Sequence, residues 1–595
     1  MSHPTKCACK DTNGTELPSH KSDLTGQYCD HGRRDFLKAA GLMALTAPLL
    51  PPRLSGSLDG ASRLHSKEIL RNKSIEKGKA TVLTILHTAD IHGQLMTHDE
   101  FFIENGQSVY KKRGGYATLK TMIDALRREN PANTLLIDGG DCFQGSGVAA
   151  FSKGRAVIPL MNHLQYDLVL PGNWEVLYGK QMMMEDMFSY TAAKVCANMY
   201  HDDQRDTGNL IFPPYFVTTV GNVKVGFIGY NDPLTPVRQS PAFSKGIRFT
   251  HPETNVQGYI KMLRKELRCD IVVLLTHMGL AQQIGLADQS FIKGADYILG
   301  ADTHERVRVP LKREYAFVTE PGAFGSFISK LDIVVEKGRI KEHAYQLLDV
   351  DPERYKEDAA TKALVTEVRA PYQERVDRII GSTKAPLVRY YVLETPLDNF
   401  VTDAIMWKFN PDIVLSNGFR FCPPLVPDPD TGVAEISIDY LWSMLPDESE
   451  AKHGLITGKQ LWNYLENELE NAFASNPAKR FGGWLVRFKG MEINFTIMNE
   501  KGKRVNWIKV KGAPLKMEAK YSVVACERDG DPDTTICRLE DVIAPRRLGI
   551  TLHAIIEEYL AVHSPISPKL EGRATATDAP STLLTQLIDV GYEFR

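Results

Sequence analysis

Residues 81–92 read TVLTILHTADIH, an apolar run that ends in two metal-binding residue types. The run Thr81–His87 has the apolar and β-branched composition of a buried strand. Asp90 and His92 follow it two positions apart, so a bend after the strand can direct both side chains at one ion. The stretch therefore predicts a buried strand with a metal site at its carboxyl end.

Four further segments repeat this arrangement. In each, carboxylate, amide or imidazole side chains follow an apolar run, and these residues are Asp141, Asn173, His277, Asp302 and His304. The carboxyl ends of parallel strands meet at one edge of an open α/β sheet, where ligands bind. Two ions at such an edge can activate a water molecule and polarise an ester. Five segments in this order predict a two-metal hydrolase site.

The alternation of apolar runs with helical stretches predicts an α/β fold in the first half of the chain. The expected strands there are Thr81–His87, Thr134–Ile137, Leu168–Leu170, Val223–Ile228, Ile271–Leu275 and Tyr297–Leu299, with helices at Gly115–Glu129 and Val256–Arg268. The second half is expected to be α+β. Its strands are Ile413–Leu415, Trp484–Phe488, Met491–Phe495 and Tyr521–Ala525, with a helix at Gln460–Phe473.

A chain of 595 residues is too long for a single core, so we expect two domains with additional segments. The predicted parts are a signal region over 1–55, a linker over 56–80, a metal-binding domain over 81–351, one long linking helix over 352–380, a substrate domain over 381–573 and a loose polar tail over 574–595.

The amino-terminal region resembles a twin-arginine export signal. Arg33 and Arg34 precede the mostly apolar run Ala39–Leu50, which is too short to span a membrane as a helix. The prediction is export to the periplasm, with a basic patch on a surface helix as the alternative. A net charge of −2 gives no sign of a nucleic-acid binder, and no apolar run is long enough for a membrane span.

The order of the five segments resembles the calcineurin-like metallophosphoesterases, and specifically the 5′-nucleotidase family. The family motifs D-x-H, G-D, G-N-H-E, H and G-H-x-H/Q correspond to Asp90-Ile-His92, Gly140-Asp141, Gly172-Asn173-Trp174-Glu175, His277 and Gly300-Ala-Asp302-Thr-His304. The resemblance covers most of the chain. It implies a calcineurin-like sandwich joined by a long helix to a 5′-nucleotidase-type α+β domain.

The same resemblance implies a site for two divalent ions. Metal one takes Asp90, His92, Asp141 and His304, and metal two takes Asp141, Asn173, His277 and Asp302. Oxygen and nitrogen donors without thiolate make manganese the expected metal, with zinc and iron as alternatives. Asp302 stands where the family has a histidine, so this site carries one more negative charge. Glu175 is expected to orient a ligand.

Trp174 is the second departure from the family pattern. In family phosphatases a histidine at this position, with an aspartate three residues on, assists departure of the leaving group, whereas this chain has Trp174 and Leu177. An indole N–H donates a hydrogen bond but transfers no proton at neutral pH. A thiolate with a pKa of about 8.5 leaves unprotonated more readily than an alkoxide with a pKa near that of water, about 15.7. The pair Trp174 and Leu177 therefore favours an S-linked ester.

In carrying a tryptophan in this motif, the chain resembles the SoxB-type thiosulfohydrolases, a subgroup of the same family. The segments Asp141-Cys-Phe-Gln-Gly-Ser146 and Gly482-Gly-Trp-Leu-Val-Arg487 look similar as well. The resemblance implies release of sulfate from a sulfonated carrier protein. A 5′-nucleotidase acting on small anionic nucleotides is the alternative, which Asn173 keeps open because the subgroup places a histidine there. A binding protein without turnover is the third hypothesis.

Candidate substrate residues lie in the second half of the chain. The segment Ser416-Asn417-Gly-Phe-Arg420 stands in the place of the nucleotidase N-G-G-x-x-R motif, so Asn417 and Arg420 are predicted to bind a phosphate or sulfonate. Phe419 and Trp484 are candidates for holding a nucleotide base between two aromatic rings. Gly482 and Gly483 predict a loop that exposes Trp484, and core packing of Trp484 is the alternative.

Overall fold

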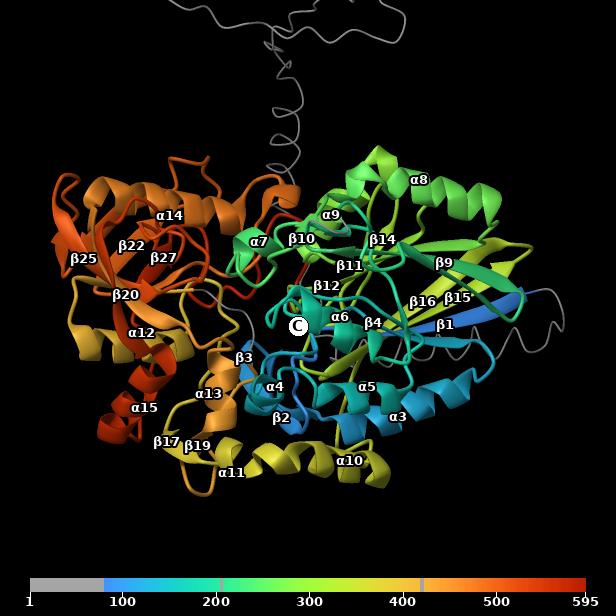
Figure 1. The fold of residues 1–595 in the computed structure, drawn as a ribbon, viewed down its shortest axis with the longest axis horizontal. Coiled ribbons are helices and arrows are strands. Elements are labelled where there is room, and N and C mark those ends of the chain that lie inside the picture. The colour runs from blue at the N-terminus through green and yellow to red at the C-terminus, as the bar shows by residue number, and fades with distance from the viewer. Residues whose placement is uncertain (1–79, 204–206, 418–421, 595) are drawn as a thin grey trace, which may run out of the picture. The chain divides into compact units, whose positions relative to one another are not determined.

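The computed structural model describes residues 80–203, 207–417 and 422–594, all of which belong to the same unit of the fold (Figure 1). The predicted export signal, with Arg33 and Arg34, lies outside the described residues, as does nearly all of the predicted linker. Within the part of the chain that is described, no helix is both long and apolar enough to cross a membrane.

The first domain contains two six-stranded sheets. The first has the order β16 (Arg339–Asp349), β15 (Phe327–Glu336), β1 (Ala80–Thr88), β4 (Thr134–Asp138), β5 (Leu168–Val169) and β6 (Ala193–Lys194). The second has the order β13 (Leu311–Lys312), β14 (Phe317–Thr319), β12 (Tyr297–Ala301), β11 (Ile271–His277), β9 (Val223–Asn231) and β8 (Tyr215–Val220). Each expected strand of this half is present.

The two sheets face each other across a common core. Leu83 and Ile137 of the first sheet belong to the same buried cluster as Phe227 and Leu275 of the second. Helices α3 (Tyr116–Glu129) and α5 (Val157–Leu164) lie on one side in Figure 1, and α8 (Val256–Lys261) and α9 (Leu280–Ala287) lie on the other. The fold is therefore the expected sandwich.

Parallel pairing sets the edge at which the metal-binding segments meet. Strand β1 pairs in parallel with β4, and Thr88 is aligned with Asp138. In the second sheet β11 pairs in parallel with β12, and His277 is aligned with Ala301. Because these strands end at the same level, the residues that follow them come together in space.

The second domain is α+β, as expected. Its larger sheet has the order β21 (Arg487–Lys489), β18 (Ile413–Ser416), β25 (Lys520–Cys526), β20 (Glu450–Thr457) and β26 (Ile543–Thr551), and its smaller sheet has β24 (Ala513–Pro514), β23 (Val505–Val510), β22 (Met491–Phe495) and β27 (Ala574–Ala576). Its helices include α12 (Pro396–Phe409), α14 (Gly458–Phe473) and α15 (Leu552–His563). Helix α14 begins two residues before the prediction because Thr457 and Gln460 form a capping box.

Shorter elements complete the described chain. They are β2 (Thr97–Glu104), β3 (Gln107–Gly114), α4 (Gly147–Ser152), α6 (Lys180–Phe188), β7 (Met199–His201), α7 (Thr235–Arg238), β10 (Ile247–Phe249), β17 (Ile379–Thr383), β19 (Ala434–Ser437) and α13 (Ile438–Met444).

The prediction of a single long helix over 352–380 is wrong. The segment contains α10 (Ala359–Arg369), a 3₁₀ turn at Ala370–Tyr372 and the short helix α11 (Gln373–Val376). Pro371 accounts for the break, because proline has no N–H to donate to the carbonyl one turn before it and its ring crowds that carbonyl.

The prediction of a loose tail over 574–595 is also wrong. Leu587, Tyr592 and Phe594 are buried and pack against a hydrophobic cluster of the first domain. The Tyr592 hydroxyl accepts a hydrogen bond of 2.9 Å from the backbone N–H of Arg306. Apolar side chains spaced through this polar stretch anchor it to the first domain. Their spacing is the sequence signal for a packed tail, and the polar average composition of the stretch conceals it.

Candidate metal centre

The predicted metal-binding residues sit in tight turns directly after strands of the two facing sheets. Asp90 and His92 follow β1, Asp141 follows β4, and Asp302 and His304 follow β12. All five have a positive φ, between 52° for His92 and 90° for Asp302. A residue other than glycine in this region costs roughly 1–3 kcal/mol, so such conformations persist where the surrounding structure imposes them. The turns direct the side chains at one another.

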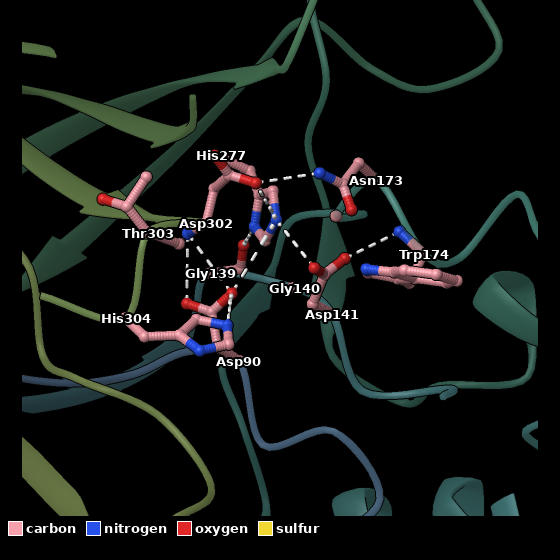
Figure 2. A network of polar contacts seen from close by, with 12 residues as sticks. Asp90, Gly139, Gly140, Asp141, Asn173, Trp174, His277, Asp302, Thr303 and His304 are labelled. Atoms are coloured by element: carbon pink, nitrogen blue, oxygen red, sulfur yellow. Dashed lines mark hydrogen bonds and ion pairs between the residues drawn. The ribbon is translucent and has the colours of Figure 1, made fainter. Parts of the chain in front are cut away.

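Five of these side chains form a compact group, which we call the metal-centre group: Asp90, His92, Asp141, His277 and His304 (Figure 2). The donor atoms of Asp90, His92 and His304 all lie within 4.8 Å of one another, and so do those of Asp90, Asp141 and His277. His92 Nε2 lies 3.0 Å from His304 Nε2, and His277 Nε2 lies 3.1 Å from Asp141 Oδ2. Every member is buried.

Backbone carbonyls fix the orientation of two imidazoles in this group. His92 Nδ1 lies 2.9 Å from the carbonyl oxygen of Gln144, and His277 Nδ1 lies 2.7 Å from that of Gly139. A carbonyl accepts only from a protonated nitrogen, so these contacts make Nδ1 the donor in both rings and direct Nε2 at the group. This is the arrangement in which metal-binding histidines are usually held.

The charges in the group also fit a divalent cation. Burial raises the pKa of Asp90 well above its ordinary value, and the Asp141 carboxylate adds to this effect although His277 opposes it. Burial also acts to raise the pKa of Asp141, but His277 and His92 outweigh it and the pKa is lowered. Two buried carboxylates this close repel each other when both are ionised, and a cation bound between them would remove that repulsion.

Glu175 holds the turn that carries Asp141. Its carboxylate accepts hydrogen bonds from the backbone N–H groups of Gly172 at 2.7 Å, Asp141 at 3.0 Å and Cys142 at 2.6 Å. Burial raises the pKa of Glu175 to about 7, with a further contribution from Asp141, while the N–H donors act against this rise. Glu175 therefore holds the backbone of Asp141, which is one of the predicted ligands.

Asn173 and Asp302 lie beside the metal-centre group and bond to each other. Asn173 Nδ2 donates to Asp302 Oδ1 at 2.8 Å, and Asp302 Oδ1 lies 3.8 Å from His277 Nε2. Both oxygens of Asp302 also accept hydrogen bonds from Arg238, each at 2.9 Å. Sequence reasoning missed Arg238, because this contact joins segments that are distant in the chain.

Trp174, the second residue at which the sequence departs from the family pattern, lies next to Asp141. Its backbone N–H donates to Asp141 Oδ1 at 2.7 Å, and its ring lies beside that carboxylate in Figure 2. The side chain is 8% exposed and lines the cavity in front of the metal-centre group. Leu177, three residues on, packs against the surrounding hydrophobic cluster.

One cavity joins the metal-centre group to the second domain. From the first domain it is lined by His92, Asp141, Asn173, Trp174, Arg238, Asp302 and His304, and from the second by residues that include Asn417, Glu468, Phe481, Trp484, Arg528 and Arg538. The predicted residue Asn417 thus faces the cavity, and its Oδ1 accepts a hydrogen bond of 2.9 Å from Arg538. Phe419 and Arg420 lie outside the described residues.

Trp484 borders the cavity but is not exposed, so that expectation is wrong. It is buried, and its indole N–H donates a hydrogen bond of 2.9 Å to the backbone carbonyl of Arg389. The neighbouring Leu485 and Val486 are fully buried and draw the segment into the core. The loop at Gly482 and Gly483 is present and continues to Val486, because β21 begins only at Arg487.

Comparison with protein families gives two matches. A model described as calcineurin-like phosphoesterase matches residues 83–306, and a model described as 5′-nucleotidase, C-terminal domain, matches residues 379–527. Together they take in more than half of the chain. They correspond to the sandwich that carries the metal-centre group and to the domain that closes the cavity.

Curated relatives share both regions at low identity. A snake venom 5′-nucleotidase from Naja atra is 24% identical over 537 residues, which cover 82% of this chain and 98% of that protein. The trifunctional nucleotide phosphoesterase protein YfkN of Bacillus subtilis is 24% identical over 552 residues, which cover 84% of this chain but 35% of that longer protein.

Two solved structures have the same fold. The sulfate thiohydrolase SoxB of Thermus thermophilus superposes with a TM-score of 0.74 at 21% identity, over 84% of this chain and 98% of that one. A 5′-nucleotidase precursor, also from Thermus thermophilus, gives 0.72 at 24% identity, over 84% and 100%. The two likenesses are nearly equal, so fold does not separate these activities. The matched regions and relatives make this chain a metal-dependent hydrolase of ester bonds.

Proposed function

Because the chain belongs to the 5′-nucleotidase family of calcineurin-like metallophosphoesterases, we propose that it hydrolyses esters whose leaving group departs without a proton. S-linked sulfate esters are the substrate class that fits best. The observation that carries this proposal is the pair Trp174 and Leu177, which stands where the family's phosphatases have a proton-donating dyad. Trp174 lines the cavity, and Leu177 packs against the hydrophobic cluster beside it.

The proposal rests on what a leaving group needs. General acid help is typically worth about 10²–10⁴-fold, and an alkoxide depends on it most. A thiolate, with a pKa of about 8.5, is stable enough to leave as the anion. Trp174 can shield the reacting atoms from water and can donate a hydrogen bond, but it cannot supply the proton that a nucleoside alkoxide requires.

The metal-centre group would hold the metal, with Asp90, His92, Asp141, His277 and His304 as ligands and with Asn173 and Asp302 beside them. Manganese is the proposed metal, and the donor set also suits zinc or iron. When bound, two such ions would supply an activated water molecule and neutralise the charge of the anionic ester. The chain itself orients His92 and His277 through the carbonyls of Gln144 and Gly139, so that each Nε2 atom is directed at the group.

A 5′-nucleotidase is the second candidate, and the curated relatives favour it. The Naja atra protein shares 98% of its length with this chain and is a 5′-nucleotidase. Asn173 retains the residue expected of that activity, and Asn417 and Trp484 border the cavity as substrate candidates. Arg420 and Phe419 remain predictions for the same wall. In this case the metal ions or a water molecule would have to assist the leaving alkoxide.

The proposed setting is the periplasm, reached through the twin-arginine signal predicted at Arg33 and Arg34. The substrate would be a small anion, or a sulfonated cysteine on a carrier protein if the S-linked class is correct. Support for export comes from the sequence pattern alone.

Product release from defined substrates tests the proposal. The manganese-loaded protein is incubated in parallel with an S-sulfonated cysteine peptide and with AMP, and sulfate and phosphate are measured. Faster release of sulfate supports the S-linked class. Absence of sulfate release alongside fast AMP hydrolysis overturns it in favour of the nucleotidase, and Asp141→Asn must abolish either activity.

A further inference from the structure

A buried guanidinium lies between two carboxylates at the edge of the metal-centre group. Arg238 Nη1 donates to Asp232 Oδ2 at 2.7 Å and to Asp302 Oδ2 at 2.9 Å, and Nη2 donates to Asp302 Oδ1 at 2.9 Å. The Arg238 side chain is 12% exposed, and it lines the cavity. Asp232 is fully buried and follows β9, so one partner comes from the same segment as Arg238 and the other from the predicted metal-binding turn.

Arg238 is fixed in charge and in position. Burial acts to lower its pKa, but the carboxylates of Asp302 and Asp232 more than reverse this, so the guanidinium is a permanent cation. Helix α7, which ends at Arg238, is held from the second domain because Arg528 donates to the backbone carbonyls of Val237 and Gln239. The guanidinium is therefore preorganised before a substrate arrives.

The guanidinium retains donors for a further partner. Both N–H groups of Nη1 are engaged, whereas the contacts made by the described residues leave Nε–H and one N–H of Nη2 available. Gly482 of the second domain lies over the face of the guanidinium. A Cβ on Gly482 would come within 3.2 Å of Nη2, 3.3 Å of Cζ and 3.6 Å of Nη1, so glycine lets this backbone approach the guanidinium without crowding it.

We propose that Arg238 binds the tetrahedral oxyanion of the substrate, a phosphoryl or sulfonyl group, beside the metal centre, and that Asp232 and Asp302 hold its guanidinium in place. The inference rests on the proposed function, since it concerns the same site. This role of Arg238 explains why an aspartate stands at position 302. A histidine there would offer a metal ligand but no second acceptor for the paired N–H groups of Arg238, whereas a carboxylate accepts two parallel hydrogen bonds.

Binding of inorganic anions tests this role without turnover. Phosphate and sulfate are titrated separately into the manganese-loaded wild type, Arg238→Gln and Arg238→Lys, with binding followed by calorimetry and metal content by elemental analysis. Loss of a charged hydrogen-bonding group predicts a dissociation constant raised roughly 10- to 100-fold in Arg238→Gln at unchanged metal content. Arg238→Lys keeps the positive charge but loses the paired N–H groups of the guanidinium, so we expect a smaller rise in the dissociation constant for that variant.

The outcomes separate the alternatives. Weaker binding of phosphate assigns a phosphoryl substrate, weaker binding of sulfate assigns a sulfonyl substrate, and unchanged binding of both overturns the proposal. Loss of bound metal from Arg238→Gln also overturns it, because the arginine would then act through the metal centre. If that variant is insoluble, Arg238→Lys gives the same decision.

A matched control is Arg155→Gln. Arg155 also lies between two carboxylates of the first domain, at 3.0 Å from Asp186 and 3.1 Å from Glu185, but it does not line the cavity. Its substitution should leave anion binding at the wild-type value. Since anion binding requires no reaction, the result stands even if neither ester class is hydrolysed, which keeps a failure of this inference distinct from a failure of the proposed function.

Discussion

The two walls of the cavity are built in different ways. On the wall of the first domain, turns that directly follow parallel strands carry four of the side chains, and all four residues have a positive φ: His92, Asp141, Asp302 and His304. On the wall of the second domain, Glu468 comes from helix α14, while Phe481, Arg528 and Arg538 come from segments outside the helices and strands. We therefore propose that the first wall holds the metal ions and carries out the chemistry. The second wall selects the substrate.

The first prediction tests whether hydrolysis depends on the metal ions of the first wall. Removal of metal by a chelator should abolish hydrolysis completely, because activation of water at neutral pH depends on the ions. Addition of manganese should restore the rate. The measurement is ester hydrolysis before and after chelation and after titration with manganese, zinc and iron. Hydrolysis that survives removal of all bound metal, as shown by elemental analysis, would contradict this account.

The support beneath the first wall gives the next largest effect. Glu175→Gln replaces an acceptor of four backbone N–H groups with a side chain whose amide nitrogen can only donate. Loss of such support typically weakens metal binding or activity about 10–100-fold. The manganese concentration for half-maximal activity should rise by this factor. Glu185→Gln, an exposed partner of Arg155, is the control and should show the wild-type dependence.

The second wall should respond differently. Arg538 bonds to Glu468 at 2.6 Å and to Asn417 at 2.9 Å, so Arg538→Gln disturbs the cavity without touching the metal-centre group. We expect KM to rise about tenfold, the loss associated with one charged hydrogen bond, while kcat and metal affinity stay near wild type. Steady-state kinetics at saturating manganese measure this. A fall in kcat with unchanged KM would place Arg538 in the chemistry instead.

The walls also differ in how far the sequence predicted them. Each metal-binding residue could be found because a strand and the turn after it are encoded together, as in the run from Thr81 to His92. Arg538 and Arg238 belong to no such local pattern, since they contact Asn417 and Asp302, which lie far away in the chain. Trp484 was misjudged for a related reason. The glycines before it predict a loop correctly, but burial of the ring depends on a distant carbonyl at Arg389.

The carboxyl-terminal tail gives the smallest effect, on stability. Leu587 is 1% exposed and packs against the first domain, so Leu587→Ala should lower the free energy of unfolding by about 2–5 kcal/mol. Ile588, its neighbour, is 39% exposed, and Ile588→Ala should change the stability by only about 0.5 kcal/mol. Urea unfolding of both variants makes the comparison. Equal effects would mean that the tail does not pack as described.

The central claim is that Trp174 marks a site whose leaving group needs no proton. The double variant Trp174→His with Leu177→Asp restores the missing dyad, and its rates on AMP and on an S-sulfonated cysteine peptide are compared with wild type at saturating manganese. The account predicts a gain of about 10²–10⁴-fold on AMP and little change on the S-linked ester. Equal changes on the two substrates, or a wild type that already hydrolyses AMP faster than the S-linked ester, would contradict it.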